Sequence, residues 1–250
     1  MIRSACLALC LLLVAPAALA QAPERLDPNG TRLFLSPTAR TMPQGQGRFS
    51  DYMVFFPSVA YGFTDWLDAS AGVSILPGSS TQILTVNTKA RAFSAENVDI
   101  AVGGLFLTPV GEGSGEGFGG TVYGLATFGS ARRSVTLGTY VAYAGYDGTT
   151  TNCSGDVCEV EDDFAFSLSD GVVVMAGGEL QLSNSIKLIT ENYVGFGDGS
   201  TGGIVSGGIR FFGERLAVDL AFFRPFDSVN DDLDGFPFVP YVGFAYNFGR

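Results

Sequence analysis

The C-terminal stretch Phe236–Phe248 reads FPFVPYVGFAYNF, and its side chains alternate between two chemically different faces. One face carries large apolar residues, namely Phe238, Pro240, Val242, Phe244, Tyr246 and Phe248. Since successive side chains of a strand point to opposite faces, the pattern predicts a β-strand with one strongly apolar face. A strand so near the chain end is an exposed edge, which pairing with the first strand of a closed barrel would remove.

The N-terminal residues predict export. Met1–Ala20 contains Arg3, an apolar run and Ala18-Leu19-Ala20, the pattern of a cleaved secretory signal peptide. Residues 21–30 are then expected to form a periplasmic lead-in, and residues 31–250 a single β-domain. No later stretch offers about 18 consecutive apolar residues, so the sequence excludes a helical membrane protein. The formal net charge of −11 argues against a nucleic-acid partner.

Turn-forming residues divide the chain into about twelve strands, with eight to ten as alternatives, and no segment has a helical period. The first two strands are predicted at about 31–36 and 48–64, with a bend at Pro57. Alternate connections differ in length. Short turns are expected at 64–66, 95–97, 130–133, 184–185 and 213–215. The other connections are a short one at 77–80 and longer loops at 37–47, 109–119, 147–163, 198–202 and 227–235. Short turns at one rim and long loops at the other are typical of transmembrane barrels, and a soluble sandwich has no reason to alternate in this way.

The closing strand and the Tyr61–Leu67 stretch (YGFTDWL) resemble bacterial outer-membrane β-barrels of the porin-like class. The chain departs from that class by adding Gly249 and Arg250 after the final aromatic residue. The resemblance implies short periplasmic turns, longer extracellular loops and a location in the outer membrane of a diderm bacterium. Its expected partners are membrane lipid, lipopolysaccharide and the barrel-assembly machinery, which in that class reads the closing strand, here Phe236–Phe248. A composition of 34 Gly, 21 Phe and only two Lys is consistent with this class.

Strand alternation predicts which side chains face lipid and which face the lumen. The residues expected to face lipid are Leu84, Val86, Val135, Val141, Leu188, Val218, Leu220, Val242 and Phe244. Those expected to line the lumen are Asp68, Thr85, Asn87, Lys89, Arg91, Asp99, Glu179, Gln181, Lys187, Glu191, Arg210 and Asp219, together with Ser70, Ser74, Ser206 and Asn247. An Arg or Lys at the lipid midplane costs roughly 2–4 kcal/mol, so these charges should point inward.

Two functions are compatible with a charged lumen. The charges can line a passive channel for small polar solutes, with Lys89, Arg91, Lys187 and Arg210 setting the ion preference, because about twelve strands enclose more space than side chains fill in eight. They can also form paired clusters that fill a narrow barrel with a structural or surface-interaction role. A soluble secreted β-protein that binds a ligand is a third hypothesis. A disulfide is expected between Cys153 and Cys158, the only cysteines after the signal peptide.

Other motifs are weak. Gly115–Gly120 matches G-x-G-x-x-G, but it lies between strands with no following helix, so it is interpreted as a loop. Asn230, Asp232 and Asp234 resemble part of a calcium loop, but Tyr241 occupies the position that requires Glu, so neither a metal nor another cofactor is predicted. The chain has no histidine, which excludes Ser-His and Asp-His chemistry. A carboxylate pair such as Glu179 with Glu191 remains conceivable, but no spacing singles it out. The sequence therefore predicts a protein that is not an enzyme and has no catalytic residues.

Overall fold

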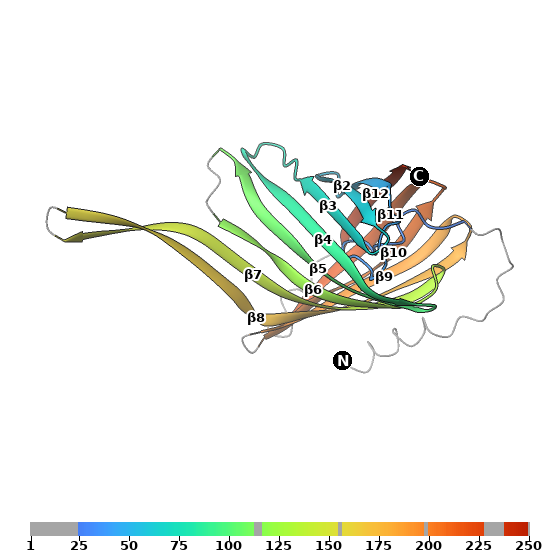
Figure 1. Cartoon of the computed structure of the whole chain (residues 1–250). Helices are drawn as coiled ribbons and strands as arrows, with labels where there is room; N and C mark the ends of the chain where they lie inside the picture. Colours follow the sequence, from blue (N-terminus) through green and yellow to red (C-terminus); the bar gives the residue numbers. More distant parts are fainter. Residues whose placement is uncertain (1–24, 113–116, 155–156, 198–199, 228–237, 250) are drawn as a thin grey trace.

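The computed structural model describes residues 25–112, 117–154, 157–197, 200–227 and 238–249, which form one closed antiparallel barrel of twelve strands (Figure 1). No helix among these residues is long and apolar enough to cross a membrane. The strands are β1 (Gln46–Tyr52), β2 (Phe56–Thr64), β3 (Leu67–Val73), β4 (Thr81–Ala95), β5 (Val98–Gly111), β6 (Gly117–Gly129), β7 (Arg133–Ser154), β8 (Val157–Ser183), β9 (Ile186–Gly197), β10 (Ser200–Phe212), β11 (Leu216–Asp227) and β12 (Val239–Gly249).

The barrel closes through the C-terminal strand, as the sequence predicts. β12 pairs with β11 on one side and with β1 on the other, where Phe49 lies opposite Tyr246. Burial alternates along the middle of β12, with Tyr241, Gly243, Ala245 and Asn247 buried inside and the intervening residues exposed outside. This closure leaves neither β1 nor β12 as an unpaired edge.

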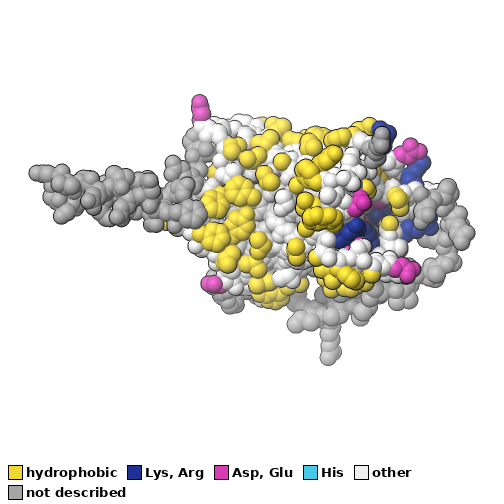
Figure 2. Space-filling model, in the orientation of Figure 1, with side chains coloured by type: hydrophobic (Ala, Val, Ile, Leu, Met, Phe, Trp, Pro, Cys, Tyr) yellow, Lys and Arg dark blue, Asp and Glu magenta, His cyan; other side chains and the backbone are white. Residues whose placement is uncertain are grey.

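The outer wall is apolar. In Figure 2 hydrophobic side chains spread over the visible wall, while most visible charged side chains gather toward one end of the barrel. Of the residues predicted to face lipid, Val86, Val135, Leu220, Val242 and Phe244 are exposed. The other four, Leu84, Val141, Leu188 and Val218, are partly exposed, and none of the nine belongs to the buried core. So much exposed apolar surface is what a lipid-facing wall requires.

The first two predicted strands are wrong. Residues 31–36 belong to no wall strand, and the predicted strand 48–64 is two strands, β1 and β2, joined by a tight turn. Met53 and Val54 make this turn with positive φ angles of 57° and 68°. Non-glycine residues seldom adopt such angles. The turn was missed because neither of these two positions carries the Gly, Asn or Asp that usually marks one. The predicted total of twelve is correct because these two errors cancel.

The two rims differ only in part as expected, because β10 already begins at Ser200, inside the predicted loop 198–202, and the unpredicted β1–β2 connection is a tight turn at the rim where longer loops were expected. The five predicted short turns all lie between strands at one rim, which we call the short-turn rim. At the opposite rim, however, residues 147–163 do not form a loop. β7 and β8 stay paired beyond the barrel wall as far as Ser154 and Val157, and this long hairpin projects from the barrel in Figure 1. The glycine motif is also corrected in part, because Gly117–Gly120 belong to β6.

Candidate functional site

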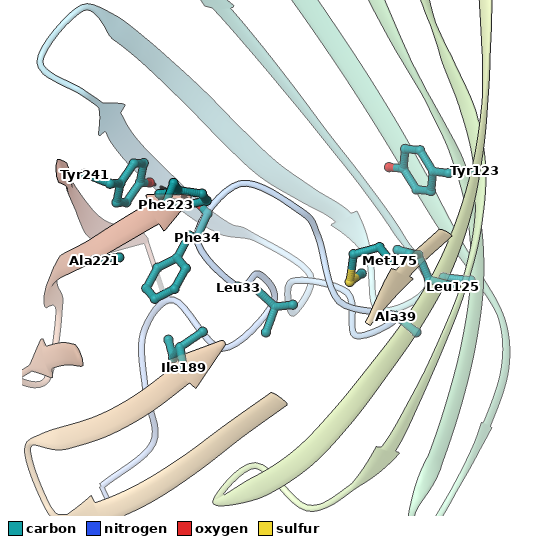
Figure 3. Packing of buried hydrophobic residues seen from close by; sticks show 11 residues of the cluster. Leu33, Phe34, Ala39, Tyr123, Leu125, Met175, Ile189, Ala221, Phe223 and Tyr241 are labelled. Atoms are coloured by element: carbon teal, nitrogen blue, oxygen red, sulfur yellow. Dashed lines mark hydrogen bonds between the residues drawn. The ribbon is translucent and has the colours of Figure 1, made fainter. Parts of the chain in front are cut away.

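The lumen contains part of the chain itself. Residues 27–42, which we call the plug, precede β1 and fold back inside the barrel instead of forming a wall strand or a lead-in outside it (Figure 3). The plug contains a small antiparallel turn, in which the Leu33 amide donates to the Ser36 carbonyl and the Thr38 amide to the Thr31 carbonyl, each at 2.9 Å. Leu33, Phe34 and Ala39 are fully buried. The plug therefore occupies space that an open channel would leave to water.

Apolar contacts hold the tip of the plug to the inner wall. The Phe34 ring packs against Phe223 and Tyr241, with ring centroids 5.9 and 5.8 Å apart. The Tyr241 hydroxyl also donates a 3.0 Å hydrogen bond to the Phe34 carbonyl oxygen. Met175 and Ile189 belong to the same buried cluster, which Figure 3 shows between plug and wall. These inward-facing apolar residues fill a core rather than a water-lined passage.

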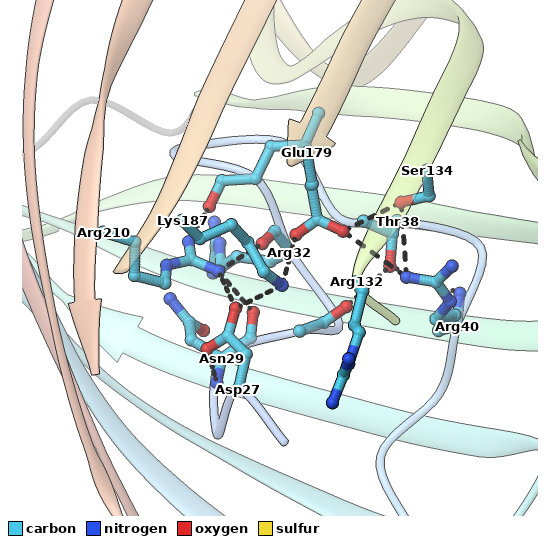
Figure 4. A network of polar contacts seen from close by, with 12 residues as sticks. Asp27, Asn29, Arg32, Thr38, Arg40, Arg132, Ser134, Glu179, Lys187 and Arg210 are labelled. Carbon is cyan, nitrogen blue, oxygen red and sulfur yellow. Dashed lines mark hydrogen bonds and ion pairs between the residues drawn. The ribbon is translucent and has the colours of Figure 1, made fainter. Parts of the chain in front are cut away.

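Ion pairs hold the start of the plug (Figure 4). Asp27 Oδ2 lies 2.8 Å from Lys187 Nζ and 2.9 Å from Arg210 Nη1. Burial alone would raise the pKa of Asp27, but the Arg210 guanidinium and the Lys187 ammonium hold that pKa well below its ordinary value of 3.8. Arg210 also binds Asp219 through two hydrogen bonds of 2.6 and 3.0 Å, and Lys187 pairs with Glu179 at 3.3 Å. Lys187 and Arg210 are therefore each paired with a carboxylate of the wall in addition to Asp27.

Glu191 of β9 binds the plug backbone. Its Oε2 accepts hydrogen bonds from the amides of Phe34 at 2.6 Å and Leu35 at 3.0 Å, and its Oε1 accepts one from Ser36 at 2.9 Å. The Tyr193 hydroxyl donates to the same carboxylate. Glu191 is fully buried, so the plug amides are the partners that its oxygens need.

The end of the plug is held by the opposite part of the wall. Lys89 of β4 donates to the carbonyl oxygens of Thr38 at 3.1 Å and Arg40 at 2.5 Å, and it pairs with Asp68 at 3.5 Å. Asp68 in turn accepts a 2.9 Å hydrogen bond from the Met42 amide. The plug is therefore bound to the wall on several sides, mainly through polar contacts.

A cavity of about 530 Å³ lies inside the barrel beside the plug. Its lining combines plug residues with the inner faces of several wall strands and includes four tyrosines, Tyr52, Tyr123, Tyr140 and Tyr193. Tyr123 and Tyr140 are neighbours, with ring centroids 5.4 Å apart. The charged residues of the lining are Arg32, Arg48, Lys89 and Asp68, so cations outnumber carboxylates by three to one. This excess contrasts with the net charge of −11 of the whole chain.

The residues predicted to line the lumen divide into three groups. Lys187, Glu191, Arg210, Asp219 and Glu179 are buried, and none of them lines the cavity, which corrects the prediction that Lys187 and Arg210 face an open passage. Asp68, Thr85, Asn87 and Lys89 line the cavity together with Ser70 and Ser74. The remaining five residues form the third group, which does not line the cavity. Among them, Arg91 and Asp99 pair with each other at 3.8 Å, and Gln181 neighbours Lys187 in the β8–β9 pairing. Ser206 hydrogen-bonds to the backbone of Glu191, and Asn247 donates to the Pro28 carbonyl oxygen at 2.7 Å.

Glu179 and Glu191, the carboxylate pair that the sequence left conceivable for catalysis, have structural roles instead. Glu179 accepts hydrogen bonds from Ser134 at 2.9 Å and from Lys187 at 3.3 Å, whereas Glu191 binds plug amides. The two side chains therefore have different partners.

The sequence reasoning missed four charged residues of the lumen, Asp27, Arg32, Arg40 and Arg48. A signal existed for Arg48, because Arg48 and Ser50 alternate with Phe49, and both polar residues are buried inside the barrel. No such signal existed for Asp27, Arg32 and Arg40. They lie on the plug, whose position depends on contacts with wall strands far away in the sequence.

Two predictions fall on residues that are not fully described. Cys153 and Cys158 are opposite each other in the β7–β8 pairing, but their side chains lie outside the described part, so the disulfide stays a prediction. The weak calcium-site residues Asn230, Asp232 and Asp234 also lie outside the described residues. Within the described ranges no group of three His, Cys, Asp or Glu side chains is placed to hold a metal ion.

An antiparallel barrel with an apolar outer wall and a charged interior is the fold of the porin-like outer-membrane barrels. Comparison with the KdgM porin agrees. The chain is similar to the KdgM porin, including a structure described as in complex with disordered oligogalacturonate, with a TM-score of 0.53, 10% identity and coverage of 82% of this chain and 98% of that one. The COG4313 outer membrane channel from Pseudomonas putida F1 has a TM-score of 0.48 and 12% identity, with coverage of 84% and 98%. No family model matches the sequence. No curated protein matches it either.

Proposed function

We propose that the protein is an outer-membrane channel for small polar solutes whose lumen is closed by the plug until the plug moves. The observation that carries the proposal is the cavity of about 530 Å³ inside a barrel with an apolar outer wall, whose lining includes hydroxyl, amide and charged groups beside apolar side chains. A purely structural barrel needs no cavity, because side chains can fill its lumen. The absence of histidine supports a role other than catalysis.

The contacts of the plug suit a movable element. Most of them are hydrogen bonds and ion pairs, which water can replace when the plug leaves. Lys187 and Arg210 also pair with Glu179 and Asp219, at 3.3 and 2.6 Å, and these two carboxylates belong to wall strands rather than to the plug. These two cations therefore stay paired in both states, which avoids the large cost of leaving either of them buried without a partner.

Planar-bilayer recording of the wild-type protein and of Asp27→Asn tests the proposal. The substitution weakens the attachment of the plug to Lys187 and Arg210 without touching a wall strand. A charge-assisted hydrogen bond is roughly twice as strong as a neutral one, so the open probability should rise about tenfold. Asp170→Asn, at an exposed position of β8, is the matched control and should behave as wild type.

A static, plugged barrel is the second candidate, favoured by the many contacts between plug and wall. It predicts that wild type and Asp27→Asn are both silent in bilayers even though each is folded. Folding is checked independently by the heat-dependent mobility shift of the barrel on gels. Silence of both folded proteins would reject the channel proposal.

A further inference from the structure

Arg32 and Arg48 differ from the other cations inside the barrel. Lys89, Lys187 and Arg210 each have a carboxylate within 3.5 Å, and Arg40 has one at 3.4 Å. Within the described residues neither Arg32 nor Arg48 forms an ion pair, and each has a buried Nε atom without a hydrogen-bond partner. Arg48 is only 5% exposed. A buried cation without a counter-charge is costly, so its presence requires a compensating partner.

Both arginines belong to the lining of the cavity. Arg32 is on the plug, where it donates to the Tyr52 hydroxyl and the Leu35 carbonyl oxygen, and its guanidinium carbon lies 4.2 Å from the centre of the Tyr52 ring. Arg48 is on β1 and donates a 2.7 Å hydrogen bond to Thr31 Oγ1. These contacts orient the two groups, and none of them is with a carboxylate. The one carboxylate in the lining, Asp68, is already engaged with Lys89 at 3.5 Å.

We propose that the cavity binds a small carboxylate-bearing, polyhydroxylated solute, whose carboxylate completes the site formed by Arg32 and Arg48. Guanidinium groups are the side chains best suited to planar carboxylates, since they offer several N–H donors in a fixed geometry. Hydroxyl and amide groups around them, such as Thr85, Asn87 and Tyr123, supply partners for solute hydroxyls, and the tyrosine rings supply apolar faces. A volume of about 530 Å³ is within the range of small-molecule sites.

The position of Arg32 gives the site a second property. A carboxylate that contacts both Arg32 and Arg48 connects the plug to the wall. A ligand that binds only this arrangement stabilises it by mass action, so the bound anion favours the docked plug. This consequence rests on the proposed channel function, whereas anion binding itself does not.

Isothermal titration calorimetry on the purified barrel in detergent tests the site with glucuronate and glucose, which differ only at C6. Glucuronate should bind, and glucose should bind at least tenfold more weakly. Arg48→Gln should weaken glucuronate binding by at least tenfold. Arg91→Gln is the matched control, since Arg91 is partly exposed, pairs with Asp99 at 3.8 Å and is not part of the cavity lining.

Arg32→Gln provides an independent variant because it changes the plug and leaves every wall strand intact. It should also lose at least tenfold in affinity, which keeps the test decisive if Arg48→Gln fails to fold. Equal affinity for glucuronate and glucose, or unchanged glucuronate affinity in folded Arg48→Gln and Arg32→Gln, overturns the site. Bilayer recording separates the two proposals: a conducting barrel without anion binding rejects only the site, and an anion-binding barrel that never conducts rejects only the channel.

Discussion

Glu191→Gln should release the plug while keeping the barrel closed. The carboxylate has two oxygens, and both accept hydrogen bonds from plug amides, Oε2 from Phe34 at 2.6 Å and Oε1 from Ser36 at 2.9 Å. Glutamine retains one acceptor and places an N–H donor where the other oxygen lay. The plug amides that bonded to the replaced oxygen therefore lose their acceptor and face the N–H donor of the glutamine.

The size of the effect follows from these contacts. Hydrogen bonds to a charged acceptor contribute about 1.5–3 kcal/mol each, so losing one or two of them should cost roughly 1.5–6 kcal/mol of plug docking. At 1.4 kcal/mol for each factor of ten, the undocked population should rise about 10- to 20,000-fold. Because amide exchange reports such local opening, the amides of Phe34, Leu35 and Ser36 should exchange faster by the same factor.

Hydrogen exchange followed by mass spectrometry measures this rate directly. The strands of the wall should exchange as in wild type, and Glu214→Gln, in the exposed turn between β10 and β11, should leave the plug unchanged. If plug exchange in folded Glu191→Gln stays within threefold of wild type, Glu191 does not hold the plug. If wall strands and plug accelerate together, the substitution has destabilised the barrel rather than undocked the plug, and the reasoning also fails.

Three further outcomes are expected. Acid should undock the plug. Because the pKa of Asp27 is depressed in the folded protein, its contribution to plug docking is fully present above the ordinary value of 3.8 and is lost as pH falls through the lower folded value. Plug exchange should therefore accelerate below about pH 4, relative to the general pH dependence of exchange. Asp27→Asn should remove this extra acceleration, and an unchanged response in that variant would exclude Asp27 as the cause. Phe244→Arg, on the exposed outer face of β12, should cost roughly 2–4 kcal/mol in urea unfolding from lipid vesicles if residue 244 lies near the membrane midplane, whereas Phe244→Leu should cost much less; equal stabilities would contradict a lipid-facing wall. Cys153 and Cys158 should resist thiol labelling until a reductant is added, and two freely reactive thiols in the unreduced protein would contradict the disulfide.

The sequence alone determined most of the barrel wall, from β3 to β12. In β12 the alternation of Val242, Phe244 and Tyr246 with Gly243 and Ala245 predicted which face is exposed, and the structure confirms it. The reason is local, since side chains of a strand alternate by geometry and a lipid-facing wall requires apolar residues at every second position. The five turns of the short-turn rim were predictable for the same local reason, because the chain must reverse where its alternating runs are interrupted.

Only the tertiary structure decided what fills the lumen. Thr31–Ser36 has a strand-like sequence, but it has no partner strand in the wall and lies inside the barrel. Alternation shows that a segment has two faces, and it does not show what each face contacts. Phe34 is placed by Phe223, Tyr241 and Glu191, all more than 150 positions away in the chain. Likewise, the pattern predicted that Lys187 and Arg210 point inward, but only the folded chain brings Asp27 between them and leaves Arg32 and Arg48 without an ion pair among the described residues. Charge pairing in a closed barrel depends on three-dimensional proximity, which local sequence pattern does not encode.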